Sequence, residues 1–96
     1  MSEIVLVKFK FINDGKSKWI DWSKQLSKRA DEVYETLINE GVKLEACFLS
    51  TNENACYYLM EAKNIKKAME IGKLSDLPID LEHKNIRKNI LSLKKN

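Results

Sequence analysis

The chain opens on a stretch in which apolar and polar side chains alternate. Between Glu3 and Ile12 one set of alternate positions is Val and Phe, while the other changes from Ile and Leu to Lys. A period of two predicts a strand with one fully apolar face. The same alternation over Val42–Ser50 and Ala55–Ala62 predicts two more strands, joined by a hairpin turn at residues 51–54.

Apolar side chains spaced three and four residues apart predict the helices. The longest such stripe predicts a helix from Ser17 to Glu40, with Ser17 as its N-cap. A short helix is expected after Asn64, which is a good N-cap residue. A last helix is expected from Ile79 to Leu93, because Pro78 is tolerated in a first turn.

The alternation also assigns each strand residue to one of two sheet faces. We expect the helices to cover a face that consists of Val5, Val7, Phe9, Phe11, Leu44, Ala46, Phe48, Tyr58 and Met60. The opposite face would then hold Ile4, Leu6, Lys8, Lys10, Glu45, Cys47, Leu49, Tyr57, Leu59 and Glu61. That mixture suits a face that packs on a second subunit and leaves a polar pocket. The alternative is a solvated face with Lys–Glu cross-strand pairs.

The element order β-α-β-β-α-α predicts an α+β fold of the ferredoxin-like type, with an antiparallel sheet and residues 1–96 in one domain. That plan usually closes with a fourth strand beside the first. Only residues 94–96 come after the last predicted helix, so the sequence leaves open whether a fourth strand forms. Without it the first strand is an exposed apolar edge, for which a partner chain is the simplest cover.

Composition and charge limit the classes of partner that the sequence supports. The net charge is +3, but residues 1–83 carry 12 basic and 14 acidic side chains, so the positive charge belongs to residues 84–96 at the C-terminal end. RNA-binding modules with this strand order need stacking aromatic residues on the open face, where the alternation places only Tyr57. We therefore expect no nucleic-acid partner.

The sequence also argues against a membrane partner and a secretory route. No apolar run reaches the ~18 residues of a membrane-spanning helix, and no basic segment precedes the first apolar run. We expect a cytoplasmic protein whose Cys47 and Cys56 are reduced thiols.

His83 is the single histidine, and Asp80 precedes it by one helical turn. An Asp80–His83 pair at the mouth of a pocket could act as an oriented general base, so these two residues are the catalytic candidates. The alternatives are a ligand-binding histidine or one that packs on the sheet and bonds a neighbour. The predicted ligand-binding set is Lys10, Trp22, Glu45, Tyr57, Glu61 and His83.

Cofactor and metal sites have no local signature. The chain has no glycine-rich phosphate loop and no nucleophile elbow, and the spacing of its His and acidic residues supports no metal site. We therefore expect no cofactor and no metal. Trp19 and Trp22 allow two interpretations, core packing along the helix stripe or an overhanging helix end that lines a pocket or a dimer contact.

Three stretches carry a resemblance to a known superfamily: VKFKFINDGKSKWIDW, EACFLSTNENACYYLMEA and SDLPIDLEH. In them the chain resembles small uncharacterised bacterial proteins of the dimeric α/β-barrel superfamily, in which two ferredoxin-like subunits pack sheet to sheet around a ligand-sized cavity. The resemblance implies a homodimer and transfers no chemistry.

Two functions are consistent with this picture. The first is a small-molecule-binding homodimer with a pocket between the open sheet face and the last helix, and the sequence leaves open whether the ligand is also transformed. The second is a structural or regulatory dimerisation module without a ligand. RNA binding is the least favoured function.

Overall fold

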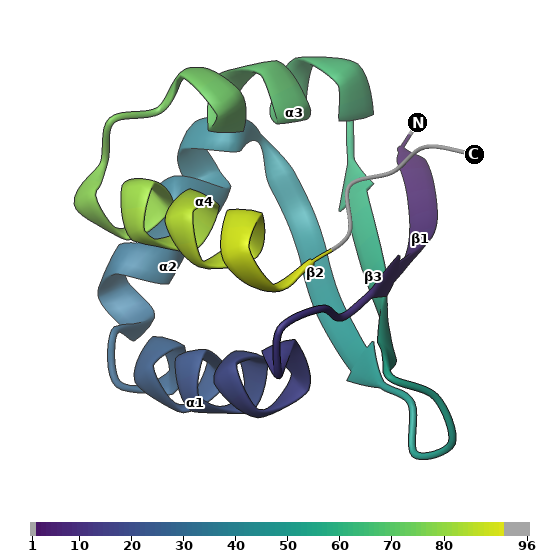
Figure 1. Ribbon diagram of the computed structural model, residues 1–96. Coiled ribbons are helices and arrows are strands. Elements are labelled where there is room, and N and C mark those ends of the chain that lie inside the picture. Colours follow the sequence, from purple (N-terminus) through teal and green to yellow (C-terminus); the bar gives the residue numbers. More distant parts are fainter. Residues whose placement is uncertain (1, 92–96) are drawn as a thin grey trace.

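The computed structural model describes residues 2–91, which form three strands and four helices. The elements in chain order are β1 (Glu3–Lys10), α1 (Gly15–Ser27), α2 (Ala30–Glu40), β2 (Val42–Leu49), β3 (Ala55–Ala62), α3 (Ile65–Leu74) and α4 (Pro78–Ile90). The helices gather on one side of the sheet, with α3 across one end of it, and the β2–β3 hairpin projects at the other end (Figure 1). None of the helices in residues 2–91 is both long enough and apolar enough to cross a membrane.

The three strands form an antiparallel sheet in the order β1-β3-β2. The central strand β3 pairs with β1 along its whole length, from Ala62 opposite Glu3 to Ala55 opposite Lys10. The three predicted strands are confirmed, although β1 and β2 end one or two residues earlier than predicted. This α+β architecture is compatible with the ferredoxin-like order.

The chain returns to the first strand after α4. Leu91 forms an antiparallel bridge with Phe11, and the backbone N–H of Ile12 donates to the carbonyl oxygen of Ile90 at 2.8 Å. Residues 94–96, for which the sequence left a fourth strand open, lie outside the described residues. Within residues 2–91, the outer edge of β1 from Glu3 to Lys10 has no strand beside it.

The single long helix predicted from Ser17 to Glu40 is wrong, because the chain turns at Lys28 and Arg29. Both backbone N–H groups reach back three residues, to Gln25 and Leu26, at 3.0 Å. The Arg29 side chain then forms ion pairs with Glu32 and Glu82, which ties the turn to α4. No proline or glycine marks this turn; a contact with the distant α4 accompanies it.

The predicted N-cap at Ser17 is also wrong, since α1 begins at Gly15 after Asp14 in the left-handed region (φ 61°). Gly15 lies against the end of α4, where a Cβ atom would be 2.5 Å from the Ile90 carbonyl oxygen. A side chain at this position would therefore force α1 and α4 apart.

The two later helices start within one residue of the predicted positions, α3 directly after Asn64 and α4 at Pro78 instead of Ile79. Asn64 is the N-cap of α3, and its side-chain oxygen accepts a hydrogen bond from the backbone N–H of Lys67 at 2.9 Å. Pro78 occupies the first turn of α4, whose last residue is Ile90. Leu93, the predicted end of this helix, lies outside the described residues.

Trp19 and Trp22 are both buried in the main core, so the core interpretation is confirmed and the overhang is wrong. The turn at Lys28 and Arg29 removes the overhang, because it folds α1 back onto α4. The main core contains Phe11, Trp19, Trp22, Cys56, Ile79, Ile90 and Leu91. A second, smaller core joins β3 to α3 through Met60, Ala62 and Ala68.

The faces of β1 and β3 match the prediction, but those of β2 are exchanged. The register shifts between Val42 and Leu44, so that Val42 stays opposite Ala62 while Glu45 comes opposite Met60. A shift by one residue moves every later side chain of a strand to the other face. Glu45, Cys47 and Leu49 therefore lie on the side of the sheet that carries the helices, although all three remain exposed, whereas Leu44, Ala46 and Phe48 lie on the opposite face.

We use the name open face for the uncovered side of the sheet. It consists of Ile4, Leu6, Lys8, Lys10, Leu44, Ala46, Phe48, Tyr57, Leu59 and Glu61. Large apolar side chains on it are strongly exposed, with exposed fractions of 67% for Ile4, 62% for Leu6 and 55% for Phe48. Exposed apolar patches of this kind mark interaction surfaces.

Candidate functional site

The predicted ligand-binding and catalytic residues lie on two sides of the sheet. Lys10, Tyr57 and Glu61 lie on the open face. The others lie on the side that the helices cover, and they are Trp22, Glu45, Asp80 and His83. The structure therefore does not unite the predicted set, and the open face lacks the Glu45 carboxylate and the histidine.

On the covered side, ionisable groups gather between the sheet and the helices α2 and α4. We call the group formed by Glu40, Glu45, Tyr58, Asp80, His83 and Arg87 the inner polar cluster. The Arg87 charge acts on the pKa values of Glu45, Tyr58 and His83, and the Asp80 charge acts on those of Glu40, Glu45 and His83. The guanidinium lies 5.5 Å from the Phe9 ring, and within residues 2–91 it has no ion-pair partner.

Glu45 and Tyr58 form the part of the cluster that belongs to the sheet. The Tyr58 hydroxyl donates a hydrogen bond to the Glu45 carboxylate. Part of the Glu45 side chain is exposed, yet burial of its carboxyl raises its pKa, and the bond from Tyr58 opposes that rise. Burial and the neighbouring Glu45 raise the pKa of Tyr58, so this phenol remains a hydrogen-bond donor.

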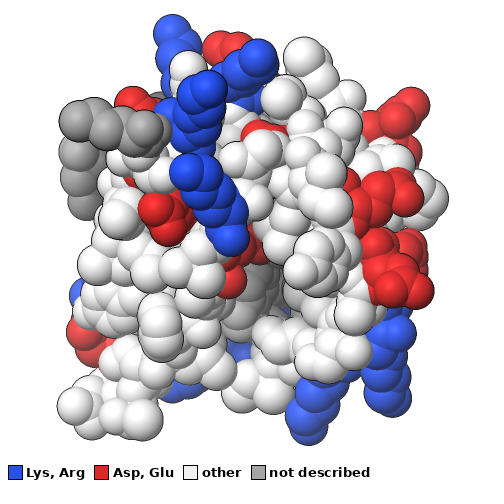
Figure 2. Space-filling view, turned by 180° about the vertical axis from the view of Figure 1, so that it is seen from behind, with Lys and Arg blue, Asp and Glu red and all other residues white. Residues whose placement is uncertain are grey.

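Glu40, in the last turn of α2, is a second carboxyl group whose pKa is raised. Burial and the nearby Asp80 and Glu45 charges raise its pKa to about 7, and Lys84 opposes them. Its carboxylate lies against Gly72 of α3, where a Cβ atom would approach it to 2.4 Å. Seen from behind, where α2 and β2 come to the front, the surface is hollowed near its middle and acidic side chains gather on one flank (Figure 2).

Asp80 is bound by hydroxyl groups and does not bond His83. The Thr36 hydroxyl lies 2.7 Å from both carboxylate oxygens, and the Ser75 hydroxyl donates to the same group. Asp80 therefore connects α2, α4 and the segment before α4. Lys84 supports that segment by donating to the carbonyl oxygens of Lys73 and Ser75, both at 2.9 Å.

His83 belongs to both the inner polar cluster and the main core. Its Nδ1 accepts a hydrogen bond from the Trp22 indole N–H at 2.9 Å, and the Trp19 ring lies 5.7 Å away. Burial and the positive charge of Arg87 lower the His83 pKa to about 4, while Asp80 opposes them. The imidazole is therefore neutral at pH 7.

Sequence reasoning missed Arg87, Tyr58 and Glu40 as members of the site. Arg87 could have been found, because it lies four residues after His83 and so shares its helix face. Tyr58 was correctly assigned to the covered face but was treated as core. Nothing in the sequence indicated that Glu40 belongs to the site, because it is partly buried only through the packing of α2 on α3 and α4.

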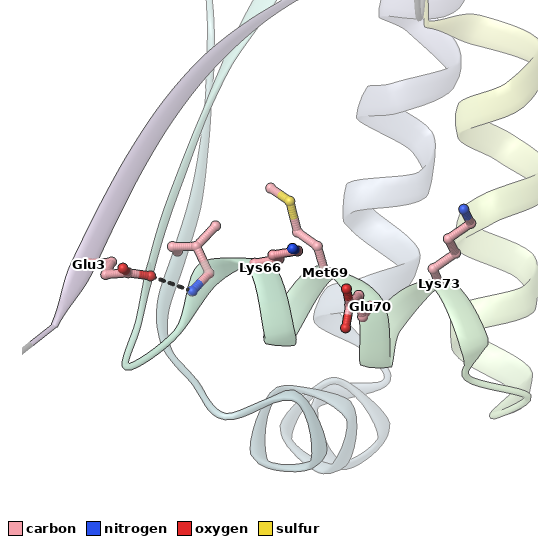
Figure 3. A pocket seen from close by; sticks show the side chains of 6 residues that line it. Glu3, Lys66, Met69, Glu70 and Lys73 are labelled. Carbon is pink, nitrogen blue, oxygen red and sulfur yellow. Dashed lines mark hydrogen bonds between the residues drawn. The ribbon is translucent and has the colours of Figure 1, made fainter.

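Two hollows on the surface lie apart from this cluster. One, of about 490 Å³, is lined by Glu3 of β1 and by five residues of α3. Figure 3 shows Glu3 facing the start of α3, where it accepts a hydrogen bond from the backbone N–H of Ile65 at 2.8 Å. The other, of about 300 Å³, lies between α1 and α4 and includes Trp22. The first contains no predicted site residue, and its lysines and acids are exposed.

Metal and thiol chemistry receive little support in the part of the chain that is described. No three His, Cys, Asp or Glu side chains of residues 2–91 lie close enough together to hold a metal ion. Cys47 and Cys56 are free thiols on the covered face. Burial, together with Cys47, raises the pKa of Cys56 to about 12, so Cys56 is a poor nucleophile.

A family model matches almost the whole chain. The protein belongs to a family of unknown function (DUF6176), whose model matches residues 2–95. No curated protein and no solved structure matches the chain.

Proposed function

We propose that this chain is a small-molecule-binding protein that works as a homodimer of the dimeric α/β-barrel type. Two copies pack through their open faces, and each binds its ligand at the inner polar cluster. The binding site thus lies on the covered side of the sheet, because the open face is mainly apolar. No reaction is assigned to the site.

The observation that carries the binding proposal is the state of Arg87. It is a half-buried guanidinium without an ion pair in residues 2–91, and its charge acts on Glu45 and Tyr58, whose pKa values are raised, and on His83, whose pKa is lowered. Displaced pKa values in one location are typical of functional sites. An uncompensated Arg in such a place is suited to bind an anionic or acceptor group of a ligand.

The dimer proposal is supported by the open face. Ile4, Leu6 and Phe48 each leave more than half of their side-chain surface exposed. Removing such surface from water contributes roughly 25 cal/mol per Å², so a second copy of the same apolar face is a favourable cover. A two-fold arrangement also lets one surface patch serve both subunits.

The binding proposal is tested by a thermal-shift screen of metabolites on three proteins. We expect compounds that raise the melting temperature of the wild type to lose this effect in Arg87→Gln. The matched control is Lys88→Gln, which removes the neighbouring exposed charge of α4 and should keep every shift. If Arg87→Gln responds like the control, the inner polar cluster is not the ligand site.

A second candidate function is a dimerisation module that binds no ligand, and the exposed open face favours it. In that case the dimer forms, no metabolite shifts the melting temperature, and Arg87→Gln behaves like the wild type.

RNA binding is a third outcome, because Phe48 lies opposite Tyr57 on the open face, beside Lys8. Binding of a single-stranded RNA at low salt would favour it over the dimer.

A further inference from the structure

The hydrogen bond between Trp22 and His83 fixes where the imidazole carries its proton. An indole N–H can only donate, so the nitrogen that faces it must have a free lone pair. That nitrogen is His83 Nδ1, 2.9 Å from Trp22 Nε1. A neutral imidazole with a free Nδ1 carries its hydrogen on Nε2.

The surroundings keep the ring in this orientation. Trp22 is 2% exposed, and its N–H finds no other acceptor within residues 2–91. Turning the imidazole over would place a C–H group against this buried donor and leave it unsatisfied. The Trp19 and Trp22 rings lie 5.7 and 6.1 Å from the imidazole, so the ring has little freedom to move.

The charges around the ring disfavour a second proton. Arg87 and Asp80 of its own helix act on the imidazole in opposite directions, and burial adds to the effect of Arg87. From the turn between α1 and α2, Arg29 lies 5.9 Å from the Trp22 ring and is paired with Glu32 and Glu82. The ring therefore stays neutral, with one acceptor nitrogen in use and one N–H group left.

The remaining N–H group has no partner among the described residues. No hydrogen bond from Nε2 is formed within residues 2–91, and in this part of the chain every fully buried side-chain nitrogen or oxygen has a partner. Nε2 therefore keeps some exposed surface, although most of the imidazole is buried. Arg87 lies four residues further along the same helix face, and it is a second donor without an ion pair in the described part of the chain.

We propose that Trp22 is a positioning residue that holds His83 as a neutral Nε2–H donor, which binds a carboxylate oxygen of the ligand together with Arg87. This inference rests on the proposed function and adds the chemical class of the ligand. It also replaces the role of general base, which the sequence suggested for His83, with a binding role. Its only basic nitrogen is occupied by Trp22, so His83 binds and orients a ligand and does not accept a proton from it.

The first test needs only the wild-type protein. His83 is the single histidine, so its two ring nitrogens give unambiguous signals in a long-range ¹⁵N–¹H correlation spectrum. We expect the pattern of a neutral ring with hydrogen on Nε2 from pH 6 to pH 8. A charged ring, or one with hydrogen on Nδ1, overturns the proposal.

Two tryptophan variants separate positioning from packing. Trp22→Phe removes the indole donor, so we expect hydrogen to appear on Nδ1 and the His83 pKa to rise. Trp19→Phe is the matched control, because Trp19 also lies in the core beside the imidazole but makes no side-chain hydrogen bond to it. Equal effects of the two variants, or an unchanged ring in Trp22→Phe, show that Trp22 only packs. If Trp22→Phe does not fold, the wild-type spectrum still decides the protonation state.

The ligand class is tested with acetate as the probe. Titrating sodium acetate into the wild type should shift the Nε2–H and Arg87 side-chain signals saturably, and sodium chloride of equal ionic strength should not. Arg87→Gln should weaken the acetate response at least tenfold. Equal responses to both salts overturn the donor role, whereas the proposed function fails only if Arg87→Gln also keeps every shift of the metabolite screen.

Discussion

The two faces of the sheet differ in the kind of side chain that each exposes or covers. The open face exposes Ile4, Leu6 and Phe48, whereas the covered side holds Tyr58 and Arg87, which are partly buried, beside the more exposed Glu45. Exposed apolar patches and partly buried ionisable groups are informative exceptions in a folded chain, because each costs free energy unless something else compensates it. The difference supports the proposal of a different partner for each face, a second copy of the chain for the open face and a polar ligand for the covered side.

The largest expected effect comes from a charge on the open face halfway along the edge strand β1. Leu6→Asp should raise the dissociation constant of the homodimer by at least about 100-fold, since a buried leucine contributes roughly 1.5–3 kcal/mol and the dimer contains two copies. Sedimentation velocity over a range of concentrations measures this constant.

The matched control for this variant is Leu74→Asp. Leu74 is 83% exposed at the end of α3 and lies off the sheet, so its substitution should leave the dimer intact. A wild-type protein that is monomeric at high concentration, or a Leu6→Asp variant that dimerises as well as the control, contradicts the assignment of the open face.

The next effect concerns the covered face, where two groups make stability depend on pH in opposite directions. The His83 pKa is lowered from 6.5 to about 4, so the unfolded chain binds the proton first and stability is lost as the pH falls through this window. The Glu40 pKa is raised from 4.5 to about 7, so the folded chain holds the proton longer and stability is lost as the pH rises through this window.

Glu40→Gln should separate these two effects. Between pH 4 and pH 6.5 its free energy of unfolding should rise with pH more steeply than that of the wild type, and the His83 contribution to this rise is at most about 3 kcal/mol, because the opposing Glu40 effect is removed. Urea denaturation at several pH values measures the slope, and Glu35→Gln, on the exposed side of α2, should keep the wild-type profile. If the free energy of unfolding depends on pH in the same way in Glu40→Gln and in the wild type, this would falsify the raised pKa assigned to Glu40.

A smaller effect is expected at the sheet part of the inner polar cluster. Tyr58→Phe removes the hydrogen bond that lowers the Glu45 pKa, so this pKa should rise further above its ordinary value. A ¹³C titration of the carboxyl groups measures it directly. Tyr57→Phe is the control, because Tyr57 lies on the open face and should leave Glu45 unchanged. An unchanged Glu45 in Tyr58→Phe would mean that this bond does not form in solution.

The smallest effect is expected from the charges at the two ends of the open face. Lys10 lies at one end of β1 and Glu61 lies opposite Ile4 at the other end, so an antiparallel packing of two copies brings them near each other. Lys10→Glu or Glu61→Lys should weaken the dimer a few-fold, since exposed ion pairs contribute about 0.2–1 kcal/mol. The double variant should recover the wild-type constant, and a double variant weaker than both single ones would exclude this orientation.

The sequence predicted the strands and the later helices because local signals decide them. The alternation in β3 and the cap at Asn64 are such signals, and both agree with the structure. The faces of β2 could not be predicted, because the register shift between Val42 and Leu44 depends on pairing with β3. The alternation remains regular through the shift, so nothing in the sequence marks it.

The turn between α1 and α2 was missed for a related reason. Its residues continue the helical stripe, and Arg29 pairs with Glu82, which is far away in sequence. The same non-local packing assembles the inner polar cluster from α2, β2, β3 and α4. The sequence therefore identified His83, Asp80, Trp22 and Glu45 individually but could not show which of them share a side of the sheet.

The pairing of β1 with β3 also has a consequence for the order of folding. Glu3 at the start of the chain finds its partner in Ala62, so β1 has no strand to pair with until most of the chain has been synthesised. Contacts this distant in sequence form slowly, and apolar strands that wait for them are prone to aggregate. We expect the hairpin of β2 and β3 to form first and β1 to join it late, so the first strand is the part of the nascent chain most in need of chaperone protection.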